Sequence, residues 1–383
     1  MFRPQSSLTT GIAILLTLSL LAPGVAFAAT KKVTTPPKKP VAKKVVAKPV
    51  LVPLVFSGWV PYWKKTDGTA EAVAHFKSLD EVSPFSYEVD PDGSIVDTAK
   101  LSEGPWPGMI ATAKAKNVKV IPTVIWHNKT AIYDVLSATT TRAAHVDELV
   151  AIASESNYAG IDIDYENKSV ETRYYFSQFL TELSTRLHAK KRVLVCTIEA
   201  RTPVSSRFTV PKTVEYVNDY KIIGKVCDTV RIMTYDQMND DIRLVASNDD
   251  QLYMPVADND WVEKVIANAI IDIPKSKVMI GAASYGYEYR VTNNAEGFER
   301  LRAISAPDAL ALAATQGITP ARNAAGERSF SYNKNGELRY VTWSDGTAIL
   351  QKFRIARKLG VRGVSLFKFD GQIDPALWKL LGE

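Results

Sequence analysis

The sequence has few of the residues from which metal sites are built. Its 383 residues include only two cysteines and four histidines. Neither HExxH nor CxxC occurs, and His75, His127, His145 and His188 show no metal-ligand spacing. A glycine-rich phosphate loop and a GxSxG motif are missing as well. We therefore expect no metal ion and no cofactor.

The chain also lacks an apolar run long enough to span a bilayer comfortably. The run Gly11–Ala22 has about 12 residues, follows Arg3 and ends before the Pro-Gly pair at 23–24. The small-x-small pattern at 26–28 then suits cleavage, so residues 1–28 are typical of a Sec signal peptide. An uncleaved N-terminal anchor is the alternative. We expect a secreted or cell-envelope-associated protein.

Acidic residues are absent from residues 1–54. Arg3 and seven lysines there account for eight of the 47 basic residues, which leaves 39 basic against 41 acidic residues in the remainder. The folded part is therefore not a nucleic-acid binder by charge. The Lys/Pro-rich composition of residues 29–54 predicts a disordered linker. This linker is either a plain tether or a contact to an anionic cell envelope, and the sequence does not rank the two.

The two cysteines, Cys196 and Cys227, fall on strands that we predict to be neighbours. Export would permit a disulfide, but adjacent parallel strands rarely offer the geometry that the bond requires. Buried thiols that act as small apolar side chains are therefore favoured, and a disulfide stays open as the alternative.

From Val55 onward, apolar runs of strand character alternate with amphipathic helical stretches. The strands are predicted near 55–60, 85–89, 118–126, 159–165, 192–199, 227–235, 277–285 and 361–368. The clear helices are 142–155, 169–189, 260–270 and 347–359. Eight strands with crossover helices predict an α/β fold, a (β/α)8 TIM barrel over residues 55–383. An open doubly wound sheet is the alternative.

The last two predicted strands are separated by about 75 residues, more than one helix and its loops need. Within this segment, residues 287–346 contain glycine, asparagine and short alternating stretches. We therefore expect a small α+β insertion between strands 7 and 8, beside the mouth of the barrel. An insertion in this place would deepen a cleft for an extended ligand.

A row of three acids, Asp162, Asp164 and Glu166, lies on the fourth predicted strand. Strand side chains alternate between faces, so the acids share one face while Ile161 and Ile163 take the other. Partly buried like charges cannot all ionise freely, so at least one acid should hold a proton near neutral pH. A solvated amphipathic strand and a hard-cation site are the alternatives, although the EF-hand spacing fails.

The stretch Gly160–Glu166 resembles the DGxDxDxE signature of glycoside hydrolase family 18, a family of chitinases and cell-wall N-acetylglucosaminidases. Four further stretches along the chain support the resemblance through their order and spacing: 57–63, 233–236, 281–286 and 363–367. The tract at 343–345 resembles the spore-cortex-lytic branch more than the typical chitinases. The resemblance implies a secreted glycosidase that cleaves β-1,4 bonds of N-acetylglucosamine-containing polymers, peptidoglycan or chitin. A catalytically weak or inactive, lectin-like barrel is the alternative.

The resemblance further implies substrate-assisted retaining catalysis. Glu166 would act as general acid and then as base, and Asp164 would hold the substrate acetamide. Asp162 would modulate Asp164, and Tyr235 would donate a hydrogen bond to the acetamide oxygen. The implied substrate-binding residues are Met233, Asp236, Gln237, Trp59, Tyr62, Trp126, Tyr285 and Phe367. For each rim aromatic among them, a place in the core is the alternative.

Two positions depart from the family pattern. Ala159 stands where the signature has its first aspartate, and Phe367 stands where a tryptophan usually lies under the reacting sugar. Loss of the aspartate is expected to shift the pKa of Asp162 and Asp164, and phenylalanine keeps an apolar floor with less area. Both changes predict reduced or altered activity rather than none.

Overall fold

The computed structural model describes residues 53–155, 158–292 and 297–383. Eight parallel strands form a closed ring in the order β1-β15-β9-β8-β7-β6-β5-β2, and β2 pairs again with β1. Their bounds are β1 Val55–Pro61, β2 Glu81–Val89, β5 Thr123–Trp126, β6 Gly160–Tyr165, β7 Val193–Glu199, β8 Thr229–Met233, β9 Val278–Ala283 and β15 Gly363–Phe367. The predicted (β/α)8 barrel is confirmed.

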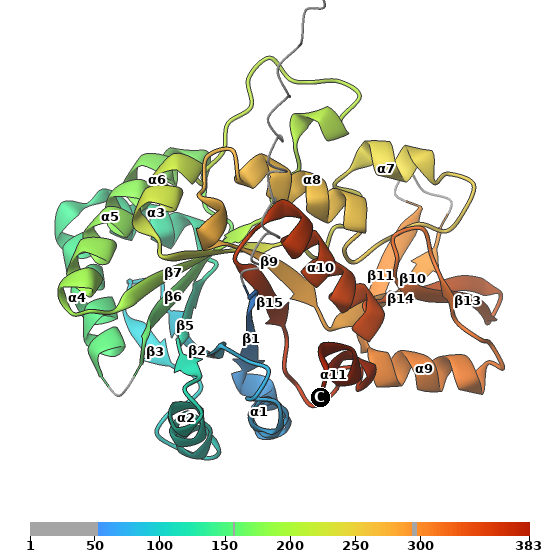
Figure 1. Ribbon diagram of the computed structural model, residues 1–383. Helices are drawn as coiled ribbons and strands as arrows, with labels where there is room; N and C mark the ends of the chain where they lie inside the picture. Colours follow the sequence, from blue (N-terminus) through green and yellow to red (C-terminus); the bar gives the residue numbers. More distant parts are fainter. Residues whose placement is uncertain (1–52, 156–157, 293–296) are drawn as a thin grey trace, which may run out of the picture. The chain divides into compact units, whose positions relative to one another are not determined.

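Helices surround the barrel (Figure 1). They are α1 Lys65–Ala74, α2 Trp106–Ala115, α3 Lys129–Ser137, α4 Thr139–Ser154, α5 Arg173–Ala189, α6 Tyr220–Val226, α7 Ile242–Ser247, α8 Asn259–Ala269, α10 Gly346–Leu359 and α11 Ala376–Leu381. Several begin at a side-chain cap; Asp345, for example, accepts the Ala348 N–H at the start of α10. None of the helices in the described ranges is both long and apolar enough to cross a membrane.

Two strand predictions need adjustment at their ends. The run predicted at 118–126 is divided into β4, Lys119–Val120, and β5, with Pro122 between them. Proline has no N–H to give to the ladder, so the division falls at this residue. β2 begins four residues before its predicted start, and a short strand, β3 Ile95–Asp97, pairs with it antiparallel. Pro84 and the buried Glu81 hid the early part of β2 from the apolar pattern.

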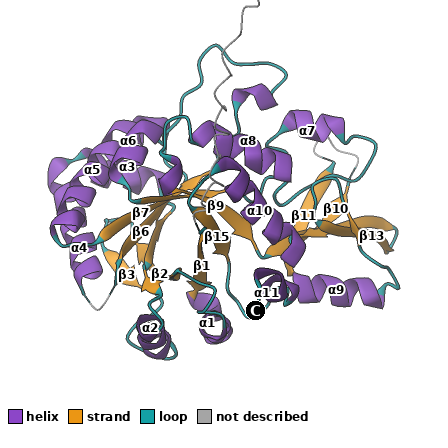
Figure 2. Ribbon diagram, viewed as in Figure 1, coloured by secondary structure: helices purple, strands orange, loops and turns teal. Residues whose placement is uncertain are grey.

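The insertion is a small antiparallel sheet between β9 and β15, shown in the right half of Figure 2. Its order is β11-β10-β14-β13-β12, with bounds β10 Tyr285–Val291, β11 Phe298–Ser305, β12 Ala321–Arg322, β13 Arg328–Lys334 and β14 Glu337–Trp343. Helix α9, Ala306–Thr315, packs on β11 and β14. A separate core that includes Ile304, Phe330 and Trp343 holds these elements together. The expected α+β insertion is therefore present.

The cysteine expectation was wrong, because Cys196 and Cys227 form a disulfide with a Cα–Cα distance of 6.1 Å. Cys196 lies on β7, but Cys227 lies in the turn between α6 and β8 rather than on the strand. The strand partner of Cys196 is Val230, three residues further on. The disulfide therefore joins β7 to the turn that precedes β8. It does not have to meet the unfavourable geometry of two cysteines that face each other on adjacent parallel strands.

The predicted signal peptide at 1–28 lies outside the described residues, as does nearly all of the predicted linker at 29–54.

Candidate active site

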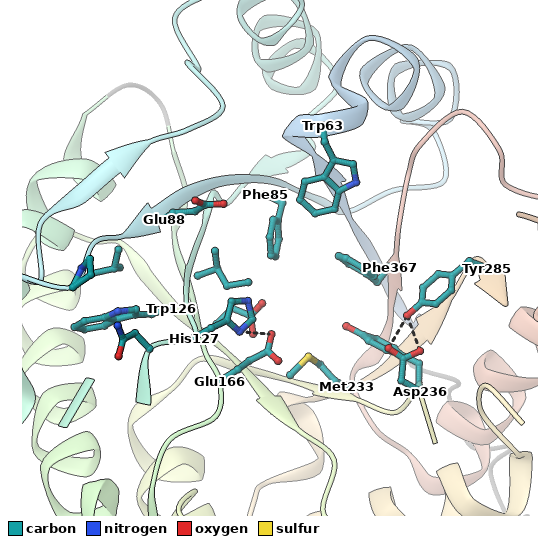
Figure 3. Close-up of a pocket in the computed structure, with 16 residues that line it drawn as sticks. Trp63, Phe85, Glu88, Trp126, His127, Glu166, Met233, Asp236, Tyr285 and Phe367 are labelled. Atoms are coloured by element: carbon teal, nitrogen blue, oxygen red, sulfur yellow. Dashed lines mark hydrogen bonds and ion pairs between the residues drawn. The ribbon is translucent and has the colours of Figure 1, made fainter. Parts of the chain in front are cut away.

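A cleft of about 590 Å³ opens at the carboxyl ends of the barrel strands. Its lining comes from residues on or just after β1, β2, β5, β6, β8, β9 and β15 (Figure 3). Parallel strands of a barrel bring their carboxyl ends together at one face, which is where residues far apart in the chain meet. Asp164 and Glu166, on β6 and just after it, line this cleft, and Asp162 lies deeper in the barrel.

Exposure rises along the acid row toward the open end of β6. Asp162 is fully buried and Asp164 is 4% exposed, whereas the side chain of Glu166 is 26% exposed. Ile161 and Ile163, on the opposite face, pack in the core between the barrel and the helices. The alternation that separates the two faces is the one expected of a strand.

Asp162 is held by four donors inside the barrel. Its Oδ2 accepts hydrogen bonds from Thr123 Oγ1 at 2.8 Å, Trp59 Nε1 at 3.1 Å and Arg231 Nη1 at 3.0 Å, and its Oδ1 accepts one from Thr197 Oγ1 at 2.8 Å. Arg231 is itself fully buried. A buried ion pair with complete hydrogen bonding leaves Asp162 little freedom to take part in chemistry.

Arg231 also connects the acid row to the lower end of the barrel. Its Nη1 donates to Ser83 Oγ at 2.8 Å and its Nη2 to Glu81 Oε2 at 3.3 Å. Glu81 receives a second arginine, because Arg362 Nη2 lies 3.2 Å from Glu81 Oε1. A chain of alternating charges therefore runs from the base of the barrel to Asp162.

Asp164 has no comparable support. Its buried Oδ1 has no hydrogen-bond partner among the described residues. Burial raises the pKa of Asp164 well above its usual value, and the nearby charges of Glu166, Asp162 and Glu199 raise it further. Asp164 therefore holds its proton to a higher pH than an ordinary aspartate does, and its protonated carboxyl can donate a hydrogen bond.

Glu166 stands at the end of the row, facing the cleft (Figure 3). Burial, followed by the charge of Glu199, raises the pKa of Glu166 to about 7, while Lys168 opposes the shift. His127 Nδ1 lies 3.9 Å from Glu166 Oε1, too far for a hydrogen bond. A carboxyl with this pKa exchanges a proton readily at neutral pH, as a residue that serves first as acid and then as base must.

Lys168 and Glu199 are functional candidates that the sequence analysis did not single out. The side chain of Lys168 is fully buried, donates to the Tyr165 carbonyl, and lies 3.4 Å from both oxygens of Glu199. Its charge lowers the pKa of Glu166, Asp164 and Glu199. The available signal was a lysine two residues after the acid row and a glutamate at the end of the next strand.

Aromatic rings form the floor beside the acids. Phe367 stacks on Tyr235 with ring centroids 5.8 Å apart and an interplanar angle of 14°, and it meets Tyr285 edge-on at 6.3 Å. Burial raises the pKa of the Tyr235 hydroxyl well above its usual value, so this group stays a hydrogen-bond donor. Tyr235, Tyr285 and Phe367 all line the cleft, where the sequence analysis expected them.

Asp236 enters the cleft because the chain turns sharply after β8. Its φ of 56° lies in the left-handed region, which places Asp236 and Met233 in the lining while the intervening Thr234 is buried. Asp236 Oδ1 accepts hydrogen bonds from Tyr287 at 2.7 Å and Tyr285 at 2.9 Å. The first strand of the insertion therefore fixes this carboxylate.

Four of the residues that we expected to bind substrate do not lie at the rim of the cleft. Trp59 is buried and its indole donates to Asp162, and Trp126 is buried in the cleft wall beside Tyr165. Tyr62 lies outside the lining and donates to Glu88 at 3.0 Å. Gln237 is fully buried behind the cleft, where its Oε1 accepts the Asp258 N–H. The assignments of Trp59, Tyr62 and Gln237 are corrected accordingly, whereas Trp126 lines the cleft and its assignment stays a prediction.

Trp63 takes the place expected of Trp59. It lines the cleft with 49% of its surface exposed and meets Phe85 edge-on, with 5.7 Å between ring centroids. β1 ends at Pro61, and the short helical turn Tyr62–Lys64 swings the next tryptophan over the cleft. The motif was therefore in the right segment, but the exposed ring is four residues later.

Ala159 lies apart from the acids. It precedes β6 by one residue, and strand alternation puts it on the side of Ile161 and Ile163 rather than that of Asp162. Its backbone pairs with Val120 and Val193. The geometry does not support the expectation that the absent carboxyl would shift the pKa of Asp162 and Asp164.

The chain matches a known protein family over most of its length. The profile described as "Glycosyl hydrolases family 18" matches residues 57–372. The chain is 24% identical over 313 residues to the uncharacterized glycosylase YvbX of Bacillus subtilis, covering 79% of this chain and 84% of the relative. It is 26% identical over 309 residues to the cortical fragment-lytic enzyme of Bacillus anthracis, covering 78% of this chain but only 66% of that relative's length.

Solved structures share the fold. The spore cortex-lytic enzyme SleL of Bacillus cereus superposes with a TM-score of 0.70 and 22% identity, covering 86% of this chain and 73% of SleL. A chitinase of Chromobacterium violaceum gives a TM-score of 0.69 and 21% identity, covering 86% of this chain and 98% of the chitinase. At these identities, the likeness concerns the architecture.

Proposed function

The chain belongs to glycosyl hydrolases family 18 and is a glycoside hydrolase, and we propose that it cleaves β-1,4 bonds of N-acetylglucosamine-containing polymers by substrate-assisted retention. The observation that carries this proposal is that Asp164 and Glu166, two carboxyls with raised pKa values, line one cleft with Tyr235, whose ring stacks on Phe367. These are the groups that an acetamide-bearing sugar needs for its own carbonyl to act as nucleophile.

Glu166 supplies and recovers the proton. In the first step it gives its proton to the glycosidic oxygen as the bond from that oxygen to the anomeric carbon breaks. The substrate's acetamide oxygen bonds to the anomeric carbon and forms a cyclic oxazolinium ion. Water then attacks the same carbon from the face the leaving group occupied, the bond from that carbon to the acetamide oxygen breaks and restores the acetamide, and Glu166 takes a proton from that water. The anomeric configuration is retained, and Glu166 returns to its starting state.

Asp164 and Tyr235 hold the acetamide group. The Tyr235 hydroxyl donates to the acetamide oxygen and aligns it with the anomeric carbon. Asp164 lies next to the acetamide nitrogen, and its carboxylate form balances the positive charge that the nitrogen gains. Asp162 stays locked by Arg231 at 3.0 Å beneath them and therefore influences Asp164 through its charge alone.

A cell-wall polymer is the favoured substrate. Relatives carry the names cortical fragment-lytic enzyme and spore cortex-lytic enzyme, whereas a more distant relative, 24% identical over 181 residues, is a class V chitinase of Arabidopsis thaliana. The segment at 1–28 has the pattern of an export signal, and the lysines of residues 29–54 suit contact with an anionic envelope. We therefore propose peptidoglycan as the substrate and a secreted or envelope-associated location.

The test compares wild type with Glu166→Gln on a chromogenic N-acetylglucosamine oligomer and on purified peptidoglycan. We expect Glu166→Gln to lower kcat by about 10²–10⁴-fold, the usual contribution of a general acid. Glu103→Gln is the matched control, because Glu103 is exposed and does not line the cleft. If wild type binds oligosaccharide but cuts neither polymer, the lectin-like alternative replaces the proposal.

A further inference from the structure

A second pocket, of about 340 Å³, lies on the loops that follow β7 and β8. Its wall comes from residues 199–202, Arg207, residues 216–218, Tyr220 and Asp240. The volume lies within the range of small-ligand sites. None of the residues proposed above as catalytic or substrate-binding belongs to this wall.

The pocket begins beside the candidate acid. Glu199 is part of its wall, and Glu199 Oε1 accepts the backbone N–H of Asn167, the residue after Glu166, at 3.1 Å. The cleft draws its lining from the ends of every barrel strand except β7, whereas the pocket stands on the β7 loop. A polymer with its acetamide at Asp164 and Tyr235 and its cleaved bond at Glu166 has the pocket on the Glu199 side of that bond.

Two arginine side chains, Arg201 and Arg207, bring positive charge to the pocket wall. Arg201 lies between two tyrosine rings, 3.8 Å from the centroid of Tyr216 and 3.7 Å from that of Tyr220, and its Nη2 donates to the Asn218 carbonyl. Arg207 is exposed on the same loop. In the part of the chain that the structure describes, neither Arg201 nor Arg207 has a carboxylate oxygen within 4.0 Å.

The acids in the wall do not cancel these charges. Glu199 is already neutralised by Lys168 at 3.4 Å and accepts Asn218 Nδ2 at 2.8 Å. Asp240 is then the one remaining acid of the wall against two arginines. Two buried wall atoms, Asn218 Oδ1 and the Tyr220 hydroxyl, have no hydrogen-bond partner among the described residues. The wall is therefore net positive and rich in polar groups.

We propose that this pocket binds a carboxylate substituent on the sugar that follows the cleaved bond, which makes the enzyme selective for acidic amino-sugar polymers over neutral ones. The inference rests on the proposed function and refines its substrate class. Arginine suits the task because its planar fork pairs with a carboxylate through two hydrogen bonds. The tyrosine rings hold Arg201 in place before the ligand arrives, which lowers the entropy lost on binding.

The experiment compares three substrates: a glycan strand bearing N-acetylmuramic acid, the same strand with its carboxyls reduced to alcohols, and a neutral N-acetylglucosamine oligomer. For Arg207→Gln we expect kcat/KM to fall about tenfold on the acidic strand and less than about twofold on the two neutral substrates. Arg201→Gln should behave likewise, and Asp240→Asn should raise kcat/KM on the acidic strand. Arg354→Gln, an exposed arginine on α10, is the control.

Equal losses on all three substrates, or no loss on the acidic strand, would overturn the pocket assignment. Failure of the proposed function gives a different result, namely no cleavage of any substrate by wild type. In that case N-acetylmuramic acid is titrated into the Glu166→Gln variant and followed by NMR or calorimetry. Binding that Arg207→Gln weakens about tenfold supports the pocket, and binding that it leaves unchanged excludes it.

Discussion

The lower and upper halves of the β6 acid row differ in partners rather than in chemistry. Asp162, in the lower half, accepts four hydrogen bonds and pairs with the buried Arg231. Asp164 and Glu166, in the upper half, share one buried cation at a distance, Lys168, and their pKa values are raised. The distance along the strand from Asp162 to Glu166 is only about 13 Å.

The difference shows how one strand can position both a carboxyl that supports the fold, Asp162, and a carboxyl that can exchange a proton, Glu166. A carboxyl bound by an arginine and three other donors, as Asp162 is, is fixed in position and serves the fold. Burial and the charge of Glu199 raise the pKa of Glu166 to about 7, which keeps a proton available for the role of general acid. The fold stabilises the lower half and tolerates an unfavourable environment in the upper half, a pattern typical of active sites.

Arg231→Met is expected to have the largest effect on stability, because it leaves the buried Asp162 without its cation. Removal of one partner from a buried ion pair costs about 3–5 kcal/mol of unfolding free energy. Asp164→Asn, the matched change in the upper half, should cost little or stabilise the protein, because burial and like charges already penalise the Asp164 carboxylate and raise its pKa. Urea unfolding at pH 7.5 measures both. Equal costs for the two variants would contradict the division of the row.

Glu166→Gln should increase stability in a pH-dependent way. The folded pKa of about 7 lies above the ordinary value of 4.5, so the folded state binds the proton more tightly and the charged form is penalised. The penalty is absent below pH 4.5, grows up to about pH 7 and then stays constant at up to about 3 kcal/mol. Denaturant unfolding at pH 4 and pH 8.5 should therefore separate the variant from wild type only at the higher pH. A constant difference would mean that Glu166 is solvated.

Lys168→Met is expected to have a moderate effect on activity. The lysine lowers the pKa of Glu166, so its loss should raise that pKa further above 7 and move the alkaline limb of kcat/KM to higher pH. The rate at pH 7 should change by no more than about tenfold. The measurement is a pH profile from 5 to 9, with Lys358→Met, which breaks a surface pair with Glu263, as control. If the alkaline limb of the Lys168→Met variant stays where it is in wild type, Lys168 does not influence the pKa of Glu166.

Local patterns in the sequence were sufficient for the barrel, the insertion and the acid row. Strand periodicity placed Asp162, Asp164 and Glu166 on one face, because alternation depends only on neighbouring residues. The partners of these acids depend on contacts across the barrel. Arg231 follows Asp162 by 69 residues and reaches it only once the ring of strands closes, so no spacing rule could have paired the two.

The missed details share one cause, which is the exact end of an element. Trp63 rather than Trp59 faces the cleft because β1 ends at Pro61 and a helical turn follows. Gln237 is buried while Asp236 is not, because the chain takes a left-handed turn at Asp236. Cys227 can bond Cys196 because it stops short of β8. Element ends are the least certain part of any sequence-based assignment.

Ala159→Asp should have the smallest effect. It restores the aspartate of the family signature, but position 159 precedes β6 on the side of Ile161, away from the acid row. With strand alternation separating the two faces, a carboxylate there cannot form a hydrogen bond with Asp162, which already has its four donors. We therefore expect kcat/KM and its pH profile to change by less than about twofold. A large gain in activity, or a shifted acid limb, would mean that the lower half of the acid row extends beyond Asp162 to the start of the strand.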